Sequence, residues 1–156
     1  MKVPFKTLSL AVAVATAAAG SSAIYAQSAQ LAGNSQLGDL AIVPYYTMRE
    51  GYATGVSVIN SSSSTQVVKI RLRRGSDSMD ALDFNVILSP EDHFGGYVGV
   101  SDSDPEGIRF FSADSSCTVP SMTAGPSGVP GFDMPDIYIE GADEGYIEVI
   151  AMGQPY

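Results

Sequence analysis

The main pattern beyond residue 38 is an alternation of hydrophobic and polar positions with a period of two. It is clearest where Val68, Ile70 and Leu72 alternate with three basic residues, which predicts a strand with one buried and one solvated face. Turn-forming residues separate the alternating stretches. The strands predicted in this way occupy residues 39–46, 54–60, 68–73, 81–89, 94–100, 108–112, 137–140 and 145–152.

Several short strands at regular spacing predict an all-β domain, an antiparallel sandwich of immunoglobulin-like type. Residues 118–136 are rich in Pro, Gly and Ser, and we expect them to form a long loop. Beyond the N-terminal segment the helical period is missing, so a fold of alternating strands and helices is disfavoured. A small closed β-barrel is the alternative.

The first segment has the layout of a secretory signal peptide. Lys2 and Lys6 precede the small apolar run from Leu8 to Ala19, and cleavage is expected around Ala23 to Ala29. The run is about a dozen residues, shorter than the roughly 20 that span a bilayer, so we expect no transmembrane segment after cleavage. We therefore divide the chain into a signal peptide (1–26), a flexible lead-in (27–37) and a sandwich domain (38–156) that is secreted, on the cell surface or in the periplasm.

The composition favours a folded, acidic protein. Hydrophobic residues make up 45% of the 156 residues, which excludes a mainly disordered chain. The chain has eight Lys and Arg residues and 17 Asp and Glu residues, which gives a net charge of -9. Removal of the signal and its two lysines leaves six cations against 17 acids, or -11. Nucleic acid is excluded as a partner, because phosphate binding needs clustered cations, and a neutral or cationic partner is favoured.

A candidate calcium site begins at Asp102. Oxygen ligands alternate at Asp102, Asp104 and Glu106 and are followed by Gly107, as in the opening of a calcium-binding loop. The closing Glu of an EF-hand is missing, and Asp114 would supply a further ligand. The competing interpretation, which we favour, is an acidic turn without metal.

The single histidine, His93, follows Glu91 and Asp92. This neighbourhood could form an acid–base pair or a corner of a metal site. One histidine cannot build a multi-histidine zinc site, and the chain has no G-x-S-x-G motif. We therefore expect a loop histidine without a catalytic role.

Four of the six cations beyond residue 26 lie close together, at Lys69, Arg71, Arg73 and Arg74. They could bind an acidic polysaccharide or a partner carboxylate. The favoured interpretation is a solvated strand face whose charges pair across strands. The candidate partners are Asp77, Asp80 and Asp83.

Three tyrosines, Tyr45, Tyr46 and Tyr52, cluster around the first predicted turn. Aromatic side chains at a loop can stack on sugars, so this cluster is a candidate glycan site. The chain has no Trp, and Tyr is common in strands for packing reasons alone.

Cys117 is the only cysteine, which is unexpected in an exported protein. Two interpretations stay open. The domain continues beyond Tyr156 and the missing part carries a partner cysteine, or the chain ends naturally and Cys117 is a buried free thiol.

The chain also resembles a known group of proteins. The segments 43–47, 58–60, 82–92 and 144–150, together with Gly51 and Thr54, resemble uncharacterised exported proteins of Gram-negative bacteria over most of residues 38–152. That group is similar in pattern to immunoglobulin-like surface proteins. The resemblance implies export and a sandwich fold, and it assigns no functional residue.

Together these observations predict an exported structural or binding module, not an enzyme, that recognises a protein or glycan noncovalently at the cell surface. No cofactor is expected apart from the candidate calcium ion. Two alternatives remain. One is an exported glycan-acting hydrolase using paired carboxylates such as Glu91/Asp92 or Asp102/Asp104. The other is a filament subunit.

Overall fold

The fold is taken from a computed structural model that describes residues 40–155. The predicted signal peptide (1–26), the lead-in (27–37) and Tyr156 lie outside the described residues. Within residues 40–155 no helix is both long and apolar enough to cross a membrane.

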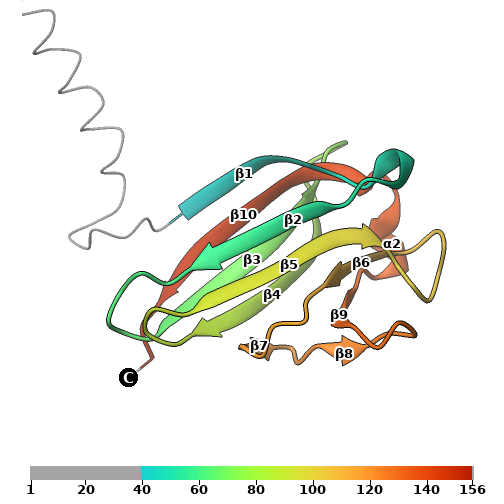
Figure 1. Cartoon of the computed structure of the whole chain (residues 1–156). Coiled ribbons are helices and arrows are strands. Elements are labelled where there is room, and N and C mark those ends of the chain that lie inside the picture. Colours follow the sequence, from blue (N-terminus) through green and yellow to red (C-terminus); the bar gives the residue numbers. More distant parts are fainter. Residues whose placement is uncertain (1–39, 156) are drawn as a thin grey trace, which may run out of the picture. The chain divides into compact units, whose positions relative to one another are not determined.

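The described residues form two five-stranded sheets in which every neighbouring pair of strands is antiparallel (Figure 1). The first sheet has the order β1 (Leu40–Thr47), β10 (Glu144–Gly153), β3 (Gln66–Arg74), β4 (Asp80–Leu88) and β7 (Cys117–Val119). The second has the order β2 (Thr54–Ile59), β5 (His93–Val100), β6 (Ile108–Phe111), β9 (Pro130–Asp133) and β8 (Thr123–Ala124). A 3-10 turn, η1 (Arg49–Gly51), joins β1 to β2, and a short helix, α2 (Asp136–Ile139), precedes β10.

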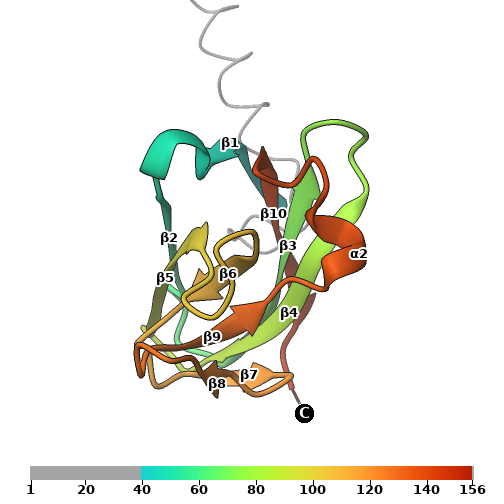
Figure 2. The ribbon, with the colours of Figure 1, turned by 90° about the vertical axis from the view of Figure 1, so that its right-hand side faces the viewer.

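The two sheets pack face to face, as the view along the strands shows (Figure 2). The predicted antiparallel sandwich is therefore confirmed. The alternative of a closed barrel is wrong, because each sheet keeps two edge strands: β1 and β7 in the first, β2 and β8 in the second.

Two predicted elements between β6 and β10 are wrong. Residues 118–136 are not one long loop, since they carry β7, β8 and β9, whose two to four residues are too short to show an alternation. Residues 137–140 are not a strand. Pro135 has the extended conformation that precedes a helix, and Asp136 begins α2. Ile137 is 77% exposed, so the alternation there does not reflect a buried face.

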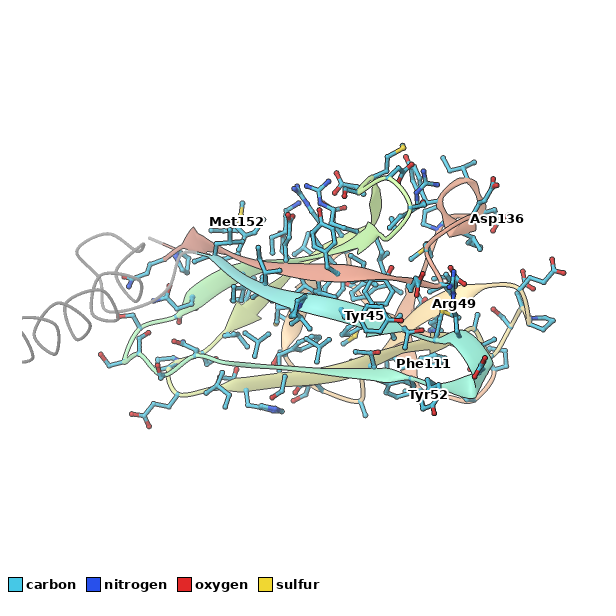
Figure 3. All side chains as sticks on the ribbon, turned by 90° about the horizontal axis from the view of Figure 1, so that it is seen from above. Tyr45, Arg49, Tyr52, Phe111, Asp136 and Met152 are labelled. Carbon is cyan, nitrogen blue, oxygen red and sulfur yellow. The ribbon has the colours of Figure 1, made fainter. Side chains whose placement is uncertain are left out.

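The core lies between the sheets and is built from the inward positions of the alternating strands (Figure 3). Phe84 of the first sheet lies at its centre. The Phe84 ring centroid is 4.3 Å from that of Phe132, 5.0 Å from that of Phe110 and 6.2 Å from that of Phe94, all in the second sheet. Aromatic pairs at these separations contribute beyond their buried area, so this group ties the two layers together.

Candidate functional site

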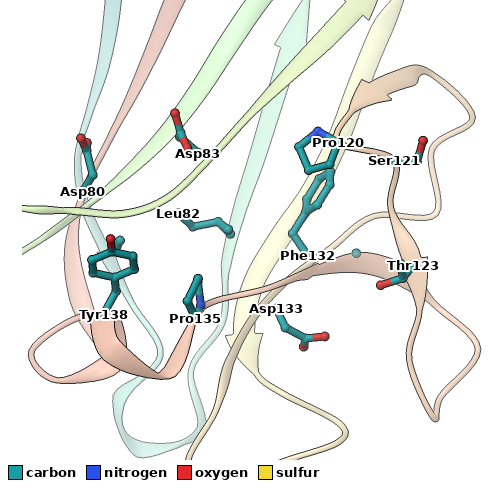
Figure 4. A pocket seen from close by; sticks show the side chains of 12 residues that line it. Asp80, Leu82, Asp83, Pro120, Ser121, Thr123, Phe132, Asp133, Pro135 and Tyr138 are labelled. Atoms are coloured by element: carbon teal, nitrogen blue, oxygen red, sulfur yellow. The ribbon is translucent and has the colours of Figure 1, made fainter.

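The described residues form a groove of about 690 Å³ at the open side of the sandwich, where β4 faces β9 and α2 (Figure 4). Its walls are mostly apolar and aromatic. They include Leu82, Pro120, Phe132, Pro135 and Tyr138. Concave sites with apolar walls and a few polar groups are where proteins most often bind ligands.

The groove exists because the edge strand β7 is short. It pairs with β4 only at Asn85–Ile87, and the chain then crosses to β8 in the other sheet. The other half of β4, from Asp80 to Phe84, has β3 as its only strand partner among the described residues. In an antiparallel strand, alternate backbone N–H and C=O groups point to each side, so part of this backbone lies at an open edge.

Three carboxylates surround the groove, at Asp80, Asp83 and Asp133. Each forms an ion pair: Asp83 with Lys69 at 2.6 Å, Asp80 with Arg73 at 2.8 Å, and Asp133 with Arg109. Their side chains are still 47–55% exposed, so their outer oxygens remain accessible to a second cation.

The four predicted calcium ligands are spread over separate contacts. Asp102 accepts a hydrogen bond from the Ser127 N–H at 2.7 Å and lies 3.9 Å from Nε of the fully buried Arg109. Hydrogen bonds from Ser127 hold the pKa of the Asp102 carboxyl below its usual range. Asp104 is used locally, because its Oδ1 accepts the Glu106 N–H at 2.9 Å.

Asp114, the fourth predicted ligand, faces another part of the molecule. Its Oδ1 accepts hydrogen bonds from the Ser116 N–H and Oγ, and its Oδ2 lies 3.9 Å from Nδ1 of His93. Over residues 40–155 no three His, Cys, Asp or Glu side chains gather closely enough to hold a metal ion. The structure thus does not bring the four carboxylates into one coordination sphere.

Lys69, Arg71 and Arg73 alternate with the buried Val68, Ile70 and Leu72 of β3, so they lie on the outer face of the first sheet, and Arg74 ends the strand. Lys69 pairs with Asp83, Arg71 with Asp80 at 3.3 Å and Arg73 with Glu148 at 3.1 Å. Arg74 pairs with Asp77. These contacts support the interpretation of a face that pairs across strands, because each basic side chain already has a carboxylate partner.

The three tyrosines do not share a surface. Tyr46 is fully buried, and its hydroxyl donates to the Ala142 carbonyl oxygen at 3.0 Å. Burial raises the pKa of Tyr46 well above its usual value. Tyr45 is exposed and donates to Glu144 at 2.9 Å, and Tyr52 is exposed as well. A sugar platform that needs Tyr46 is therefore wrong.

His93 begins β5 and is exposed. The two oxygens of Asp92 accept the backbone N–H groups of Ser89 and His93, so Asp92 does not pair with the imidazole. The imidazole instead contacts Ser57, with 2.9 Å between Ser57 Oγ and His93 Nε2, and lies near Asp114. Sequence reasoning missed this group because its members come from three separate segments.

Cys117 lies on the edge strand β7 and is exposed. The expectation that Cys117 is buried is therefore wrong.

Comparison with known proteins gives no relative that would assign a role to any of these sites. No model of a known protein family, no curated protein and no solved structure matches the chain.

Proposed function

We propose that the protein is an exported binding module that holds an extended, cationic segment of another protein noncovalently in the groove between β4 and β9. The observation that carries this proposal is the groove itself, where a short edge strand leaves half of β4 open beside apolar walls. An extended segment placed there can hydrogen-bond the open backbone of β4, which is the common mode of strand addition.

The charge of the module supports a cationic partner. Residues 40–155 carry six Lys and Arg against 16 Asp and Glu, and three of those acids lie around the groove. A Lys or Arg of the partner would reach the accessible oxygens of Asp83 or Asp133. Complementary charge would also accelerate the encounter at low ionic strength.

The site of action would be the cell surface or the periplasm. Support comes from the signal-like segment 1–26 and from the resemblance to exported immunoglobulin-like surface proteins of Gram-negative bacteria. A glycan partner, a filament role and a glycan-acting hydrolase are the competing functions. The groove favours protein over glycan because strand addition uses the free backbone edge of β4.

The experiment is a titration of the purified protein with a synthetic nine-residue peptide of alternating Val and Thr with a central Lys, followed by NMR. We expect shifts of groove resonances and weaker binding when Lys is replaced by Glu. Ser121→Arg places a bulky cation in the groove and should weaken binding at least tenfold. Ser63→Arg, on an exposed turn away from the groove, is the matched control.

Three results would overturn the proposal. The first is that the peptide does not shift groove resonances. The second is that Ser121→Arg and Ser63→Arg bind the peptide equally well. The third is that an oligosaccharide panel binds in the groove while the peptide does not, which would reassign the site to glycans.

A further inference from the structure

A serine, a histidine and an aspartate lie in a row on the outer face of the second sheet. Ser57 lies on β2, His93 on β5 and Asp114 in the segment that follows β6. Ser57 Oγ lies 2.9 Å from His93 Nε2, within hydrogen-bonding distance, and His93 Nδ1 lies 3.9 Å from Asp114 Oδ2. This is the order of contacts in nucleophile–base–carboxylate groups, which are recognised by geometry and not by position in the chain.

Gly95 makes room for the imidazole. Ser57 is directly opposite Gly95 in the β2–β5 register, and His93 is opposite Ile59. A Cβ at Gly95 would lie 2.9 Å from His93 Cε1, closer than side chains normally approach. The imidazole can therefore lie over Gly95 and reach Ser57 on the neighbouring strand.

Asp114 supplies a fixed negative charge behind the imidazole. Its Oδ1 accepts hydrogen bonds from the Ser116 N–H and Oγ, which hold the carboxylate in place. The 3.9 Å contact is too long for a hydrogen bond, so Asp114 acts through its charge. It favours the tautomer with the proton on Nδ1, which leaves the Nε2 lone pair free to accept the Ser57 proton.

The backbone N–H of Ser57 is available to a ligand. The Asn60 N–H donates to the Asp92 carbonyl, so Asn60, Val58 and Val56 direct their backbone groups toward β5. The backbone groups of Ser57 therefore point the other way. Because β2 is an edge strand, this N–H lies at an open edge and can donate to an oxygen on an acyl group held by Ser57 Oγ.

An aromatic surface lies beside Ser57 on the same face. Tyr97 is opposite Gly55, one diagonal step from Ser57, which corresponds to about 7–8 Å. Tyr97 stacks on Phe111 with 4.8 Å between ring centroids and is 41% exposed. A Cβ added at Gly55 would meet nothing within 4 Å, so the space above this glycine is open to a small flat group.

We propose that Ser57 is the nucleophile and His93 the general base of a surface acyl-transfer site for small aryl esters, with Asp114 as a positioning residue. Ser57 Oγ bonds to the ester carbonyl carbon while its proton moves to His93 Nε2. The bond from that carbon to the aryloxy oxygen breaks, and the leaving aryloxide takes the proton from His93. Water then adds to the acyl carbon, gives its proton to His93 and releases the carboxylic acid as Ser57 regains the proton.

The site is independent of the proposed binding function, because none of the groove-lining residues belongs to it. One backbone donor serves the oxyanion, and loss of one such donor in hydrolases costs about 10²–10³ in rate. The site therefore suits activated esters, with slow turnover.

The first test is chemical labelling of the purified protein with an alkyl fluorophosphonate, with the modified serine located by mass spectrometry. We expect Ser57 to react at least tenfold faster than Ser63, an exposed serine in a turn. The second readout is release of p-nitrophenol from p-nitrophenyl acetate. Equal labelling of Ser57 and Ser63 would overturn the proposal.

The variants separate the roles. Ser57→Ala should abolish labelling at this position and lower p-nitrophenol release to that of the uncatalysed reaction, and His93→Gln should lower both rates at least tenfold. Asp114→Asn should lower the labelling rate. Asp114→Glu, which keeps the negative charge, should be labelled faster than Asp114→Asn, and a purely structural role of Asp114 would not explain that difference. Asp136→Asn, an exposed acid at the start of α2, is the matched control and should leave both rates unchanged. If a folded His93→Gln protein is labelled at Ser57 as fast as the wild type, His93 is not the general base and the proposal is wrong.

Discussion

At the scale of single residues, the hydroxyl of Tyr46 matters because burial makes the loss of its hydrogen bond expensive. Tyr46 is fully buried in β1, yet its hydroxyl reaches the carbonyl of Ala142 just before β10. This one bond connects residues that are 96 positions apart. A buried carbonyl without a donor loses the hydrogen bonds that water would give it in the unfolded chain.

Tyr46→Phe should lower the free energy of unfolding by about 1–2 kcal/mol, because it leaves the Ala142 carbonyl without its donor. The measurement is urea denaturation followed by circular dichroism. Tyr45→Phe removes a hydroxyl that is exposed and bound to Glu144, so it should change stability by less than about 0.5 kcal/mol. Equal effects of the two substitutions would contradict the role given to Tyr46.

Residue identity also explains why the serine–histidine–aspartate group could not be predicted. Ser57 has the pattern of an ordinary strand residue, and the distance of Asp114 from Asp102 along the chain suggests only a candidate calcium ligand. Their proximity depends on the register between β2 and β5 and on the glycine at position 95. Neither produces a recognisable pattern in the sequence around Ser57, His93 or Asp114. The pairing of basic residues with acids was anticipated, because opposite charges on neighbouring strands attract wherever the register permits.

At the scale of elements, strands with a clear alternation were predictable. The segment 68–73 lies inside β3, and 94–100 lies inside β5. Elements of two to four residues were not predictable, because β7, β8 and β9 are held by neighbours from distant parts of the chain. The groove depends on where β7 stops, so it could not be read from sequence either.

Among the glycines of the described residues, Gly145 at the start of β10 leaves the least room for a side chain. Gly145 pairs with Arg74, and a Cβ on it would overlap the carbonyl oxygen of Arg73. Gly145→Ala should therefore lower the free energy of unfolding by at least about 2 kcal/mol, because the backbone of β3 or β10 must shift. The measurement is the urea midpoint.

Gly55→Ala in the edge strand β2 is the matched control for this prediction. A Cβ at Gly55 would meet nothing within 4 Å, and the extra methyl group restricts the unfolded chain. We expect its stability to be unchanged or higher by about 0.5 kcal/mol. A Gly145→Ala protein as stable as Gly55→Ala would show that the two strands can separate without cost.

At the scale of the whole molecule, the pH dependence of stability should come from aspartates with lowered pKa values. Arg49 holds the pKa of Asp143 below its usual range, Arg74 does the same for Asp77, and Ser127 does so for Asp102. A lowered pKa means that the folded state binds the proton more weakly than the unfolded chain. This contribution is complete above the unfolded pKa of about 3.9 and is lost as pH falls through the lower folded values.

We therefore expect the urea midpoint to fall as the pH is lowered from 5 to 2. In Asp143→Asn the midpoint should be lower than in the wild type at pH 7, with the difference shrinking toward pH 2, because protonation removes the same ion pair. Glu106→Gln, in the exposed turn before β6, should follow the wild-type curve. A constant offset between Asp143→Asn and the wild type at every pH would contradict the assignment.

The pairing of β1 with β10 has a mechanical consequence. Leu40 is opposite Ile150 and the strands run in opposite directions, so the sandwich receives and releases the chain at the same end. Tension on these two points pulls the strands apart from that end and loads their hydrogen bonds one after another, since the bonds run across the strands. The two strands are not pulled along each other in shear, which would load all the hydrogen bonds between them at the same time. Tension applied at Leu40 and Ile150 would therefore open the first sheet one hydrogen bond at a time, beginning at that end.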